Sequence, residues 1–598
     1  MGGVPSIGIN VVDDVEDVAL FWQWLTCRRP WLAVDTETTG LDPLAPGFRL
    51  RMVQFGDLDA GWALDFQRWR GVVEDAFGWL HANGTVSVFH NANYDVAVLA
   101  SQGVKMNWDL IGDTYVLAAV DGYADESRRL KDLASERFGH WARQGESVLH
   151  RAMRTNGWTW ETVPMNFQPY TMYGVLDTVL TAKLWEGWWP DRRRWAAAHD
   201  LEVGTLRVVQ AMVRNGVGVD CAYVVAEMER LHDEEQEIAS RLYEAGVGSP
   251  SNNAEVGLAL ERAGIGLTVR TATGRTSVAK DVLSEIDHPI ARDVLRARYV
   301  HRVRTTYLGA MLKSAGGAAD GTVLIHPSIN PIEARTGRMS VNNPPMQQLP
   351  RDNPLARNSI VPRREGEVLI TADYGQIELR MWARLTRDEA LAGVLRTADE
   401  TGGDFFVEVG KDVYGDPGFK KSDPRRTLIK NVTYGTIYGA GVVTMAASAG
   451  VSEDVMEPIA AALKGRYPSF RTLGMDLVSQ GTDGGKPYWA VASPFGRAIK
   501  VRRRDEARKL PNYLDQGSSA VVLKHALVKA DAAGLTDHLM LPVHDEILLS
   551  VPVGDAEEAS QALKRCMENA ANETMETFNV RITADPSKPG ARWGSLAK

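Results

Sequence analysis

The chain has 598 residues and three widely spaced cysteines, Cys27, Cys221 and Cys566, so it is too long for one ordinary core and carries neither a disulfide framework nor a cysteine-based metal site. Its residues are 44% apolar and 24% charged, without a secretion signal or any apolar run near the roughly 18 residues of a membrane span, so we expect a soluble cytoplasmic protein of several domains. The net charge of -9 excludes bulk attraction to nucleic acid, and any such binding would need local basic clusters.

The N-terminal third begins with a predicted strand that leads into two carboxylates. Trp31–Val34 is a short apolar run followed by Asp35-Thr-Glu37. Because side chains two residues apart on a strand point to the same face, Asp35 and Glu37 can share a metal ion. Taken alone, such a triplet is more often a surface feature than a metal site. Further strands of a mixed α/β sheet are predicted at Met52–Phe55, Trp62–Leu64 and Val86–Phe89.

Two later motifs favour a metal site over a surface feature for Asp35 and Glu37. The strand Val86–Phe89 ends in His90-Asn91-Ala-Asn-Tyr94-Asp95, and Tyr173 precedes Asp177 by four residues, which places both on one face of a helix. The alternative for the second motif is a surface pair on that helix. In this order, the three motifs resemble those of proofreading 3′–5′ exonucleases, which use four carboxylates and a tyrosine.

This resemblance implies a ribonuclease H-like exonuclease domain. Two divalent metals would be held by Asp35, Glu37, Asp95 and Asp177. Tyr173 would orient the attacking water, and Asn91 and Tyr94 would contact the frayed primer end. Hydrolysis of a phosphodiester gathers negative charge on the attacking and leaving oxygens, which two metals stabilise. All four acidic positions are filled, so we expect an active exonuclease. We expect the Trp-rich stretch at about 140–200 to pack inside the protein rather than stack on single strands.

Two long amphipathic helices are predicted next. Apolar residues recur at spacings of three and four over Leu201–Val217 and Ala222–Ala245. Asn215-Gly216 and Asp220 separate the two helices.

The C-terminal half contains a short β-prone run, Val368–Ala372, which predicts a buried strand that ends at Asp373 and turns into a helix. Alone, an Asp at a strand end is often only a helix cap or a turn former. However, the stretch from Asp373 to Arg380 resembles the first palm motif of family A DNA polymerases, with Gly375 in place of the usual Ser. Arg425–Gly439 resembles the fingers helix of that family, and Leu541–Val551 resembles its second carboxylate hairpin.

Four side chains of the fingers segment recur every four residues and so share one broad helix face: Arg426, Lys430, Tyr434 and Tyr438. Arg and Lys suit a triphosphate at one end of this stripe, and Tyr suits a sugar and base at the other. The alternative is an amphipathic helix with buried tyrosines and solvated cations. Gly435 and Gly439 weigh mildly against it, because a glycine inside a helix costs about 1 kcal/mol unless close approach requires it.

The family resemblance implies further roles. Asp373 and Asp545 would hold two metals, because two close carboxylates repel unless a divalent cation neutralises them. Glu378 would exclude a ribose 2′-hydroxyl, so deoxynucleotides are the expected substrates. Contacts with primer-template DNA are implied for Arg338, Gln347, Arg508, Asn512 and Gln516.

Other segments are expected near DNA by the same resemblance. The segments Thr271–Ser277 and Arg302–Tyr307 would follow the DNA backbone, with a solvated helix face as the alternative. The basic patch Lys500–Arg504 is as likely to be a solvated charge run as a phosphate contact. The family commonly has a His at the position of Phe406, which leaves open what holds the triphosphate there.

The predicted fold class is therefore multidomain α/β and α+β, with a ribonuclease H-like 3′–5′ exonuclease domain followed by a right-hand polymerase domain. The expected limits are 1–195 for the exonuclease, 196–320 for the thumb, 321–400 and 491–598 for the palm, and 401–490 for the fingers. The expected function is template-directed DNA synthesis on a primer 3′ end by two-metal phosphoryl transfer, with proofreading. A second hydrolytic site improves accuracy where base pairing alone discriminates too little.

The expected cofactor is Mg²⁺, two ions per active site, with Mn²⁺ as a substitute. Expected partners are primer-template DNA and deoxynucleoside triphosphates, with replisome proteins such as a helicase and a single-strand binding protein as candidates; no membrane is involved and the chain is expected to be a monomer. The exonuclease motif begins at Asp35, which leaves no room for a 5′ nuclease. This layout and Tyr434 resemble bacteriophage replicative polymerases, so a bacterial host cytoplasm is expected.

Three alternatives stay open. A single-subunit RNA polymerase is disfavoured by Glu378 and by the complete exonuclease motifs. A nuclease with a silent palm is disfavoured because Asp373, Lys430 and Asp545 are all present. A noncatalytic DNA-binding scaffold is disfavoured by the presence of both carboxylate sets.

Overall fold

A computed structural model describes residues 6–122, 126–267, 269, 274, 276–351 and 353–597. The chain forms two compact units. The first unit comprises Met1–Gln210, Pro331–Gly337 and Gln480–Arg504, and the second comprises Ala211–Asn330, Arg338–Ser479 and Asp505–Lys598. Within the described ranges, none of the helices is both long enough and apolar enough to cross a membrane.

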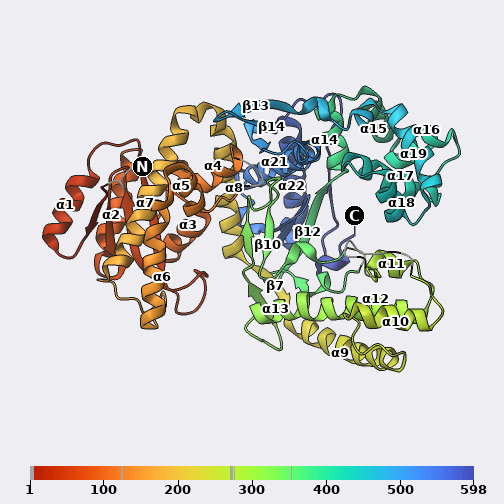
Figure 1. Cartoon of the computed structure of the whole chain (residues 1–598), viewed down its shortest axis with the longest axis horizontal. Helices are drawn as coiled ribbons and strands as arrows, with labels where there is room; N and C mark the ends of the chain where they lie inside the picture. The colour runs from red at the N-terminus through yellow and green to blue at the C-terminus, as the bar shows by residue number, and fades with distance from the viewer. Residues whose placement is uncertain are drawn as a thin grey trace. The chain divides into compact units, whose positions relative to one another are not determined.

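The first unit contains a six-stranded mixed sheet in the order β1-β4-β3-β2-β5-β6. This N-terminal part of the chain is drawn in red to orange in Figure 1. Its strands are β1 (Gly8–Val11), β2 (Trp31–Thr38), β3 (Leu50–Gly56), β4 (Ala60–Asp65), β5 (Val86–Phe89) and β6 (Ile111–Asp113). β3 runs antiparallel to β2 and β4, whereas β2, β5 and β6 are parallel, as are β1 and β4. The four strands predicted for this region are confirmed. β2 continues to Thr38, so Asp35 and Glu37 lie on it.

Alternating side chains of β2 supply two separate cores, one on each face of the sheet. Leu32 and Val34 pack in one core with Phe77 of α2 (Phe66–Ala82). Trp31 and Ala33 pack in the other with Trp185 of α7 (Gln168–Trp188).

The prediction that the tryptophans pack inside the protein is confirmed, because Trp185 and Trp188 are buried and Trp158, Trp160 and Trp189 are partly buried in apolar clusters. The other main helices of this part of the chain are α1 (Val15–Leu25), α3 (Ala92–Ser101), α4 (Thr114–Val120), α5 (Leu130–Phe138), α6 (Gln144–Asn156) and α8 (Arg192–Asn215).

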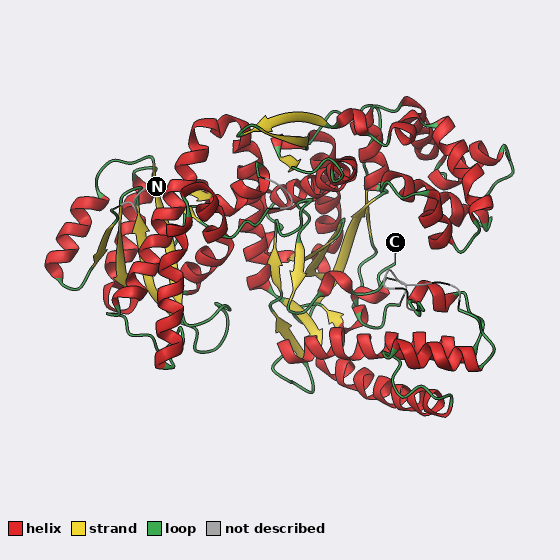
Figure 2. Ribbon diagram, viewed as in Figure 1, coloured by secondary structure: helices red, strands yellow, loops and turns green. Residues whose placement is uncertain are grey.

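The second unit contains an antiparallel sheet in the order β16-β17-β12-β18. Helix α22 (Ala556–Glu573) packs on this sheet, and α21 (Leu510–Ala532) packs against α22. Figure 2 shows the strands of the chain in yellow and its helices in red. The strands are β12 (Glu367–Tyr374), β16 (Leu539–Val543), β17 (Glu546–Pro552) and β18 (Ala584–Pro586). The strand predicted at Val368–Ala372 is confirmed and is followed by helix α14 (Ile377–Thr386). The predicted hairpin around Asp545 is confirmed as β16 and β17.

Two helical groups accompany this sheet. One shares an apolar core with α14 and consists of α15 (Glu389–Thr401), α16 (Phe405–Tyr414), α17 (Arg425–Ile437), α18 (Val442–Ala449), α19 (Glu453–Arg466) and α20 (Pro468–Thr472). The other consists of α9 (Cys221–Glu244), α10 (Asn253–Arg262), α11 (Lys280–Ser284), α12 (Pro289–Arg302) and α13 (Gly309–Ser314). Shorter strands are β7 (Val217–Asp220), β8 (Thr322–Ile325), β9 (Ser328–Asn330), β10 (Ser340–Asn342), β11 (Ile360–Val361), β13 (Ser479–Asp483), β14 (Lys486–Ala492) and β15 (Ala498–Val501).

Three glycines explain differences between predicted and observed elements. The helix predicted over Leu201–Val217 ends at Asn215, because Gly216 takes a φ of 73° and the chain enters β7. Gly435 lies inside α17, where a Cβ would stand 2.7 Å from Met445 Cγ of α18, so close approach requires glycine. Gly439 has a φ of 72° and follows the helix end, so it carries no helix-interior cost.

Glycines also let α7 approach the sheet, which matters because this helix carries Tyr173 and Asp177. A Cβ at Gly174 would stand 2.8 Å from Gln54 Cδ, and a Cβ at Gly56 would stand 2.7 Å from Thr178 Cβ. We expect Gly174→Ala to lower the free energy of unfolding of the first unit by about 1–3 kcal/mol through overpacking. The measurement is denaturant unfolding followed by tryptophan fluorescence.

The matched control is Gly78→Ala in α2, where an added Cβ meets no atom within 4 Å. Alanine is the better helix former, so this change should raise stability by about 0.5–1 kcal/mol. Equal effects of the two substitutions would contradict the close-approach explanation.

Candidate functional site

The first unit brings together five side chains that the sequence singled out. β2 supplies Asp35 and Glu37, α3 supplies Asp95, and α7 supplies Tyr173 and Asp177. The charge of Asp35 acts on Asp95, and the charges of Glu37 and Asp35 both act on Tyr173. Glu37, Asp95 and Asp177 are buried. We call the four acidic residues Asp35, Glu37, Asp95 and Asp177 the carboxylate cluster.

Burial and mutual repulsion disfavour negative charge in the carboxylate cluster. Burial is the larger cause and the neighbouring carboxylates add to it, raising the pKa of Asp35 and Asp95 well above its ordinary value. The pKa of Glu37 rises to about 8, mainly through burial, with a further contribution from Asp95. A bound cation would relieve this cost. Among the residues that the structure describes, no three His, Cys, Asp or Glu side chains are already arranged to hold a metal ion.

Asp95 is oriented by two residues that sequence reasoning missed. The Thr36 hydroxyl donates to Asp95 Oδ1 at 2.6 Å. The Asp113 carboxylate accepts from the backbone N–H of Asn91 at 2.9 Å and of Ala92 at 2.8 Å, at the start of α3. Asn91 itself adopts a φ of 74°, which Asn tolerates better than most residues. Asp113 thereby fixes the first turn of the helix that carries Asp95.

Lys131 was also missed, and it lies inside the carboxylate cluster. This side chain is only 10% exposed, and its ammonium forms an ion pair with the Asp177 carboxylate. The ammonium also lies 4.9 Å from the centroid of the Tyr173 ring. The sequence carries no clear signal for it, because Lys131 and Leu133 lie on opposite sides of α5 and both are buried.

Tyr94 lies at the edge of this cluster. Its hydroxyl donates to the Gly40 carbonyl oxygen at 2.6 Å, and its ring is partly buried against the neighbouring apolar core. Burial raises the pKa of the Tyr94 phenol to about 12, so it stays neutral.

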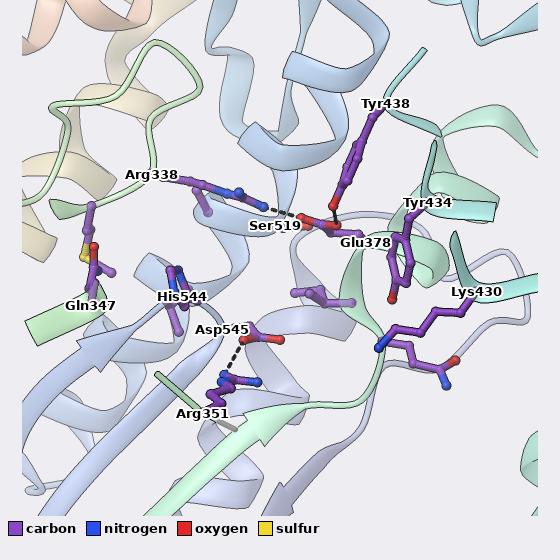
Figure 3. Close-up of a pocket in the computed structure, with 15 residues that line it drawn as sticks. Arg338, Gln347, Arg351, Glu378, Lys430, Tyr434, Tyr438, Ser519, His544 and Asp545 are labelled. Atoms are coloured by element: carbon purple, nitrogen blue, oxygen red, sulfur yellow. Dashed lines mark hydrogen bonds and ion pairs between the residues drawn. The ribbon is translucent and has the colours of Figure 1, made fainter. Parts of the chain in front are cut away.

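The second unit contains a cleft of about 560 Å³ (Figure 3). Seven residues that the sequence singled out line it: Arg338, Gln347, Glu378, Lys430, Tyr434, Tyr438 and Asp545. The lining also includes Arg351 and Ser519, which sequence reasoning missed. Three consecutive residues of the predicted stripe therefore line one cavity: Lys430 and Tyr434 of α17, and Tyr438 at the C-terminal cap of that helix.

Strand pairing brings the two predicted carboxylates together at one end of the sheet. Asp373 of β12 is paired in register with Glu546 of β17, and Asp545 precedes Glu546 at the hairpin turn. The Tyr374 N–H donates to the Asp545 carbonyl oxygen at 3.3 Å. Burial raises the pKa of the Asp545 carboxyl group, while Arg351, whose Nη2 lies 3.3 Å from Asp545 Oδ1, opposes this shift.

Glu546 lies close to Asp545, because Arg351 Nη2 is 3.4 Å from Glu546 Oε2 as well as 3.3 Å from Asp545 Oδ1. Its Oε1 accepts from Trp593 Nε1 at 3.0 Å and from the Thr371 hydroxyl. The Glu546 side chain is buried, and these bonds fix its position.

The Glu378 carboxylate of α14 contacts side chains from two other parts of the chain. One carboxylate oxygen is paired with Arg338 and the other accepts from the Tyr438 hydroxyl, as Figure 3 shows. The rings of Tyr434 and Tyr438 stack with centroids 6.1 Å apart. The pKa of Tyr434 is raised first by burial and then by the charges of Glu378 and Asp545.

The two cationic side chains of the stripe on α17, Lys430 and Arg426, have different surroundings. Lys430 is exposed and points into the cleft (Figure 3). Arg426 is not among the residues described as lining the cleft, because its guanidinium is paired with Asp404, with Nε 3.0 Å from Oδ1. The guanidinium carbon also lies 5.3 Å from the Phe406 ring centroid. Phe406 is therefore a buried platform under Arg426.

Several other predicted contacts take unexpected places. Arg508 stands in a short 3₁₀ turn before α21, whereas Asn512 and Gln516 lie on that helix and bond to each other at 3.0 Å. Lys500 and Arg502, expected to be solvated or on phosphate, are paired with Asp121 and Glu126.

The expectation for Arg302–Tyr307 is only partly compatible with the structure, because Arg304 is paired with Glu235 and Tyr307 is buried in the core. Of the expected backbone-following segment Thr271–Ser277, residues 271–273 and 275 lie outside the described residues.

The raised pKa values predict a pH-dependent stability. Folding raises the pKa of Glu37 to about 8, from about 4.3 in an unfolded chain. The folded protein therefore binds more protons between these values, and the free energy of unfolding of the first unit should fall as pH rises from about 5 to 7.5. Asp35 and Asp95 act in the same direction. The measurement is denaturant unfolding in EDTA across this pH range.

Glu37→Gln is the comparison variant, since it removes one titrating group and keeps the side-chain volume. Its stability should decline less with pH than that of the parent protein. Parallel declines in the two proteins would contradict the assignment to Glu37.

Comparison with known proteins gives two family matches. Residues 222–595 match DNA polymerase family A, and residues 13–190 match a 3′–5′ exonuclease. The DNA polymerase of Mycobacterium phage D29 is 29% identical over 99% of this chain and 97% of its own length, and that of Mycobacterium phage L5 is 28% identical with the same coverage. DNA polymerase I of Chloroflexus aurantiacus is 27% identical over 93% of this chain and 61% of its own length.

A solved structure has the same fold. The POL domain of Pol1 from M. smegmatis, in complex with a DNA primer-template and dNTP, aligns with a TM-score of 0.77 at 21% identity, covering 98% of this chain and 100% of that chain. The predicted order of an exonuclease domain followed by a polymerase domain is confirmed, and both kinds of domain generally use divalent metals. The chain belongs to DNA polymerase family A and carries a 3′–5′ exonuclease domain ahead of its polymerase domain.

Proposed function

We propose that the cleft of the second unit adds deoxynucleotides to a primer 3′ end and that the carboxylate cluster of the first unit removes mispaired ones. The observation that carries the proposal is the register of β12 with β17, which pairs Asp373 with Glu546, the residue that follows Asp545, while the Tyr374 N–H donates to the Asp545 carbonyl oxygen. A cleft lined by an ammonium, two tyrosines and Glu378 contains Asp545 as well. This combination suits a triphosphate, a sugar and a base beside a pair of metal-binding carboxylates.

We propose two Mg²⁺ ions in each site, with Mn²⁺ as a substitute. The first site would use Asp35, Glu37, Asp95 and Asp177, and the second would use Asp373 and Asp545. The donor chemistry fits, because oxygen ligands suit Mg²⁺. The raised pKa values reflect carboxyl groups that are buried close to other carboxylates. When bound, such ions stabilise the charge that gathers on the attacking and leaving oxygens of a phosphoryl group.

In the nuclease site, we assign the other residues to substrate and water. Tyr173 would orient the attacking water, since burial and the charges of Glu37 and Asp35 raise the pKa of its phenol and keep it neutral. Asn91 and Tyr94 would contact the frayed primer end. The bond from Tyr94 to Gly40 supports this, because it holds the ring at the edge of the carboxylate cluster.

In the polymerase cleft, Lys430 would contact the phosphates and Tyr434 would pack against the sugar and base. Arg426 would contact the outer phosphates after exchanging Asp404 for them. The Phe406 ring under its guanidinium suggests that Arg426 supplies the charge that a His supplies elsewhere in the family. The Gly375 position has room for the usual Ser, because a Cβ there would stand 3.5 Å from Thr583 Oγ1.

We further propose that Arg338, Gln347, Arg508, Asn512 and Gln516 contact primer-template DNA. The domain limits expected from the sequence are part of this proposal. Kinship with mycobacteriophage DNA polymerases supports a role in phage DNA replication inside a bacterial host. A helicase and a single-strand binding protein are candidate partners, and the chain is proposed to act as a monomer.

The decisive experiment uses a 5′-labelled primer annealed to a template, with Mg²⁺, in the presence and absence of all four deoxynucleotides. The protein should extend the primer with them and shorten it without them. Asp373→Asn should abolish extension and keep shortening, because it removes one carboxylate of the second site only. Asp35→Asn with Glu37→Gln should do the reverse. Loss of both activities in either variant would contradict two independent sites.

Sugar selection provides a sharper test of the cleft. Glu378→Ala removes the side chain that would crowd a ribose 2′-hydroxyl, so the ratio of kcat/KM for dATP over ATP should fall at least tenfold, or about 1.4 kcal/mol. Tyr438→Phe is the matched control, because it breaks one bond to Glu378 and leaves the carboxylate in place. Single-nucleotide incorporation kinetics give the ratio. Unchanged discrimination in Glu378→Ala would exclude the proposed gate.

A further inference from the structure

Lys131 is a buried cation in the carboxylate cluster that the expected chemistry does not use. Burying an ammonium costs free energy unless a counter-ion pairs with it. Its position in the first turn of α5 adds to that cost, since the helix N-terminus carries partial positive charge. A lysine here therefore needs the carboxylates around it.

The contacts of Lys131 converge on two residues of the proposed nuclease site. Its ammonium is paired with Asp177, and it lies 4.9 Å from the ring centroid of Tyr173. Both residues belong to α7, one turn apart. The charges of Asp35, Glu37 and Glu146 also act on the Lys131 ammonium. The cation thus reaches Asp177 and Tyr173 from α5, a helix on which neither of them lies.

We propose that Lys131 is a positioning residue of the exonuclease site, which holds Asp177 and Tyr173 in place and competes with a divalent cation for the Asp177 carboxylate. This inference rests on the proposed assignment of the carboxylate cluster as the exonuclease site. The Asp177 carboxylate has two oxygens, and one of them is in contact with the ammonium. A divalent ion that takes this carboxylate must displace the ammonium or share the group with it.

Competition for Asp177 predicts that metal affinity rises when the ammonium is removed, whereas a merely structural role predicts that it falls. Removing the ammonium makes the cluster more negative by one charge, so a divalent cation should bind more tightly. At the same time, Asp177 and Tyr173 lose the group that holds them, so the hydrolytic step should slow. An ion pair that only anchored α5 to α7 would give weaker metal binding, because its loss would loosen the ligands.

The test measures Mn²⁺ binding to the full chain by electron paramagnetic resonance of the free ion. Asp373→Asn and Asp545→Asn are present in every protein, so that the second unit does not contribute to the binding. Lys131→Met should lower the Kd for Mn²⁺ at least tenfold, whereas Lys131→Arg should stay near the parent value because it keeps the charge. Lys105→Met, an exposed lysine of the same unit, is the matched control and should leave the Kd unchanged.

The kinetic part uses the same Lys131 substitutions in the chain with an intact polymerase cleft. At saturating Mg²⁺, Lys131→Met should shorten a single-stranded 3′ end at least tenfold more slowly, and Lys131→Arg should restore most of the rate. Denaturant unfolding followed by tryptophan fluorescence verifies that the first unit of each protein is folded, and Lys131→Gln replaces Lys131→Met if that unit is not.

Unchanged or weaker Mn²⁺ binding in the neutral variants would overturn the inference. The site assignment itself would be overturned if the double variant Asp35→Asn with Glu37→Gln kept both its Mn²⁺ binding and its 3′ shortening. The two failures are distinguishable, because the first concerns Lys131 alone and the second concerns the carboxylates.

Discussion

Crowding of negative charge among buried carboxylates is the constraint on which both proposed sites depend. Burial of Asp35, Glu37 and Asp95 raises their pKa values, and each carboxylate adds to the cost of its neighbours. No local segment would adopt such an arrangement by itself. The ladder between β2 and β3 and the apolar cores on both faces of that sheet hold the strand in place and offset the repulsion.

The structure answers this charge in the same way in both units. A basic side chain from another part of the chain is paired with a carboxylate: Lys131 with Asp177, Arg351 with Asp545, Arg338 with Glu378, and Arg426 with Asp404. Each pair lowers the cost of the carboxylate and also fixes a side chain that has several free torsions.

Local patterns were sufficient for much of the fold. Short apolar runs located the strands at 31–34, 86–89 and 368–372, because a buried strand must be apolar over several consecutive residues. The four-residue spacing on α17 placed Lys430, Tyr434 and Tyr438 on one side, and these three line one cleft. Boundaries were less certain: the helix expected to reach Val217 ends at Asn215, since Gly216 adopts a backbone angle that the helix cannot continue.

Contacts between distant residues could not be read from the sequence. The spacing on α17 treats Arg426 as equivalent to Lys430, yet Asp404 holds Arg426 while Lys430 stays in the cleft. Lys500 and Arg502 look like a solvated basic run, but Asp121 and Glu126 pair with them from nearly 380 residues away. Pairing of this kind depends on which segments the fold brings together, and periodicity carries no information about it.

The sequence by itself determined the two carboxylate sets, the order of the domains and the family, because these depend on residue types at fixed local spacings. Only the tertiary structure decided the partners of those carboxylates: Lys131 beside Asp177, Asp113 at the start of α3, and Trp593 and Thr371 on Glu546. The physical reason is that a strand or helix sets the direction of its own side chains, whereas the charge and hydrogen bonds they meet come from other elements packed against them.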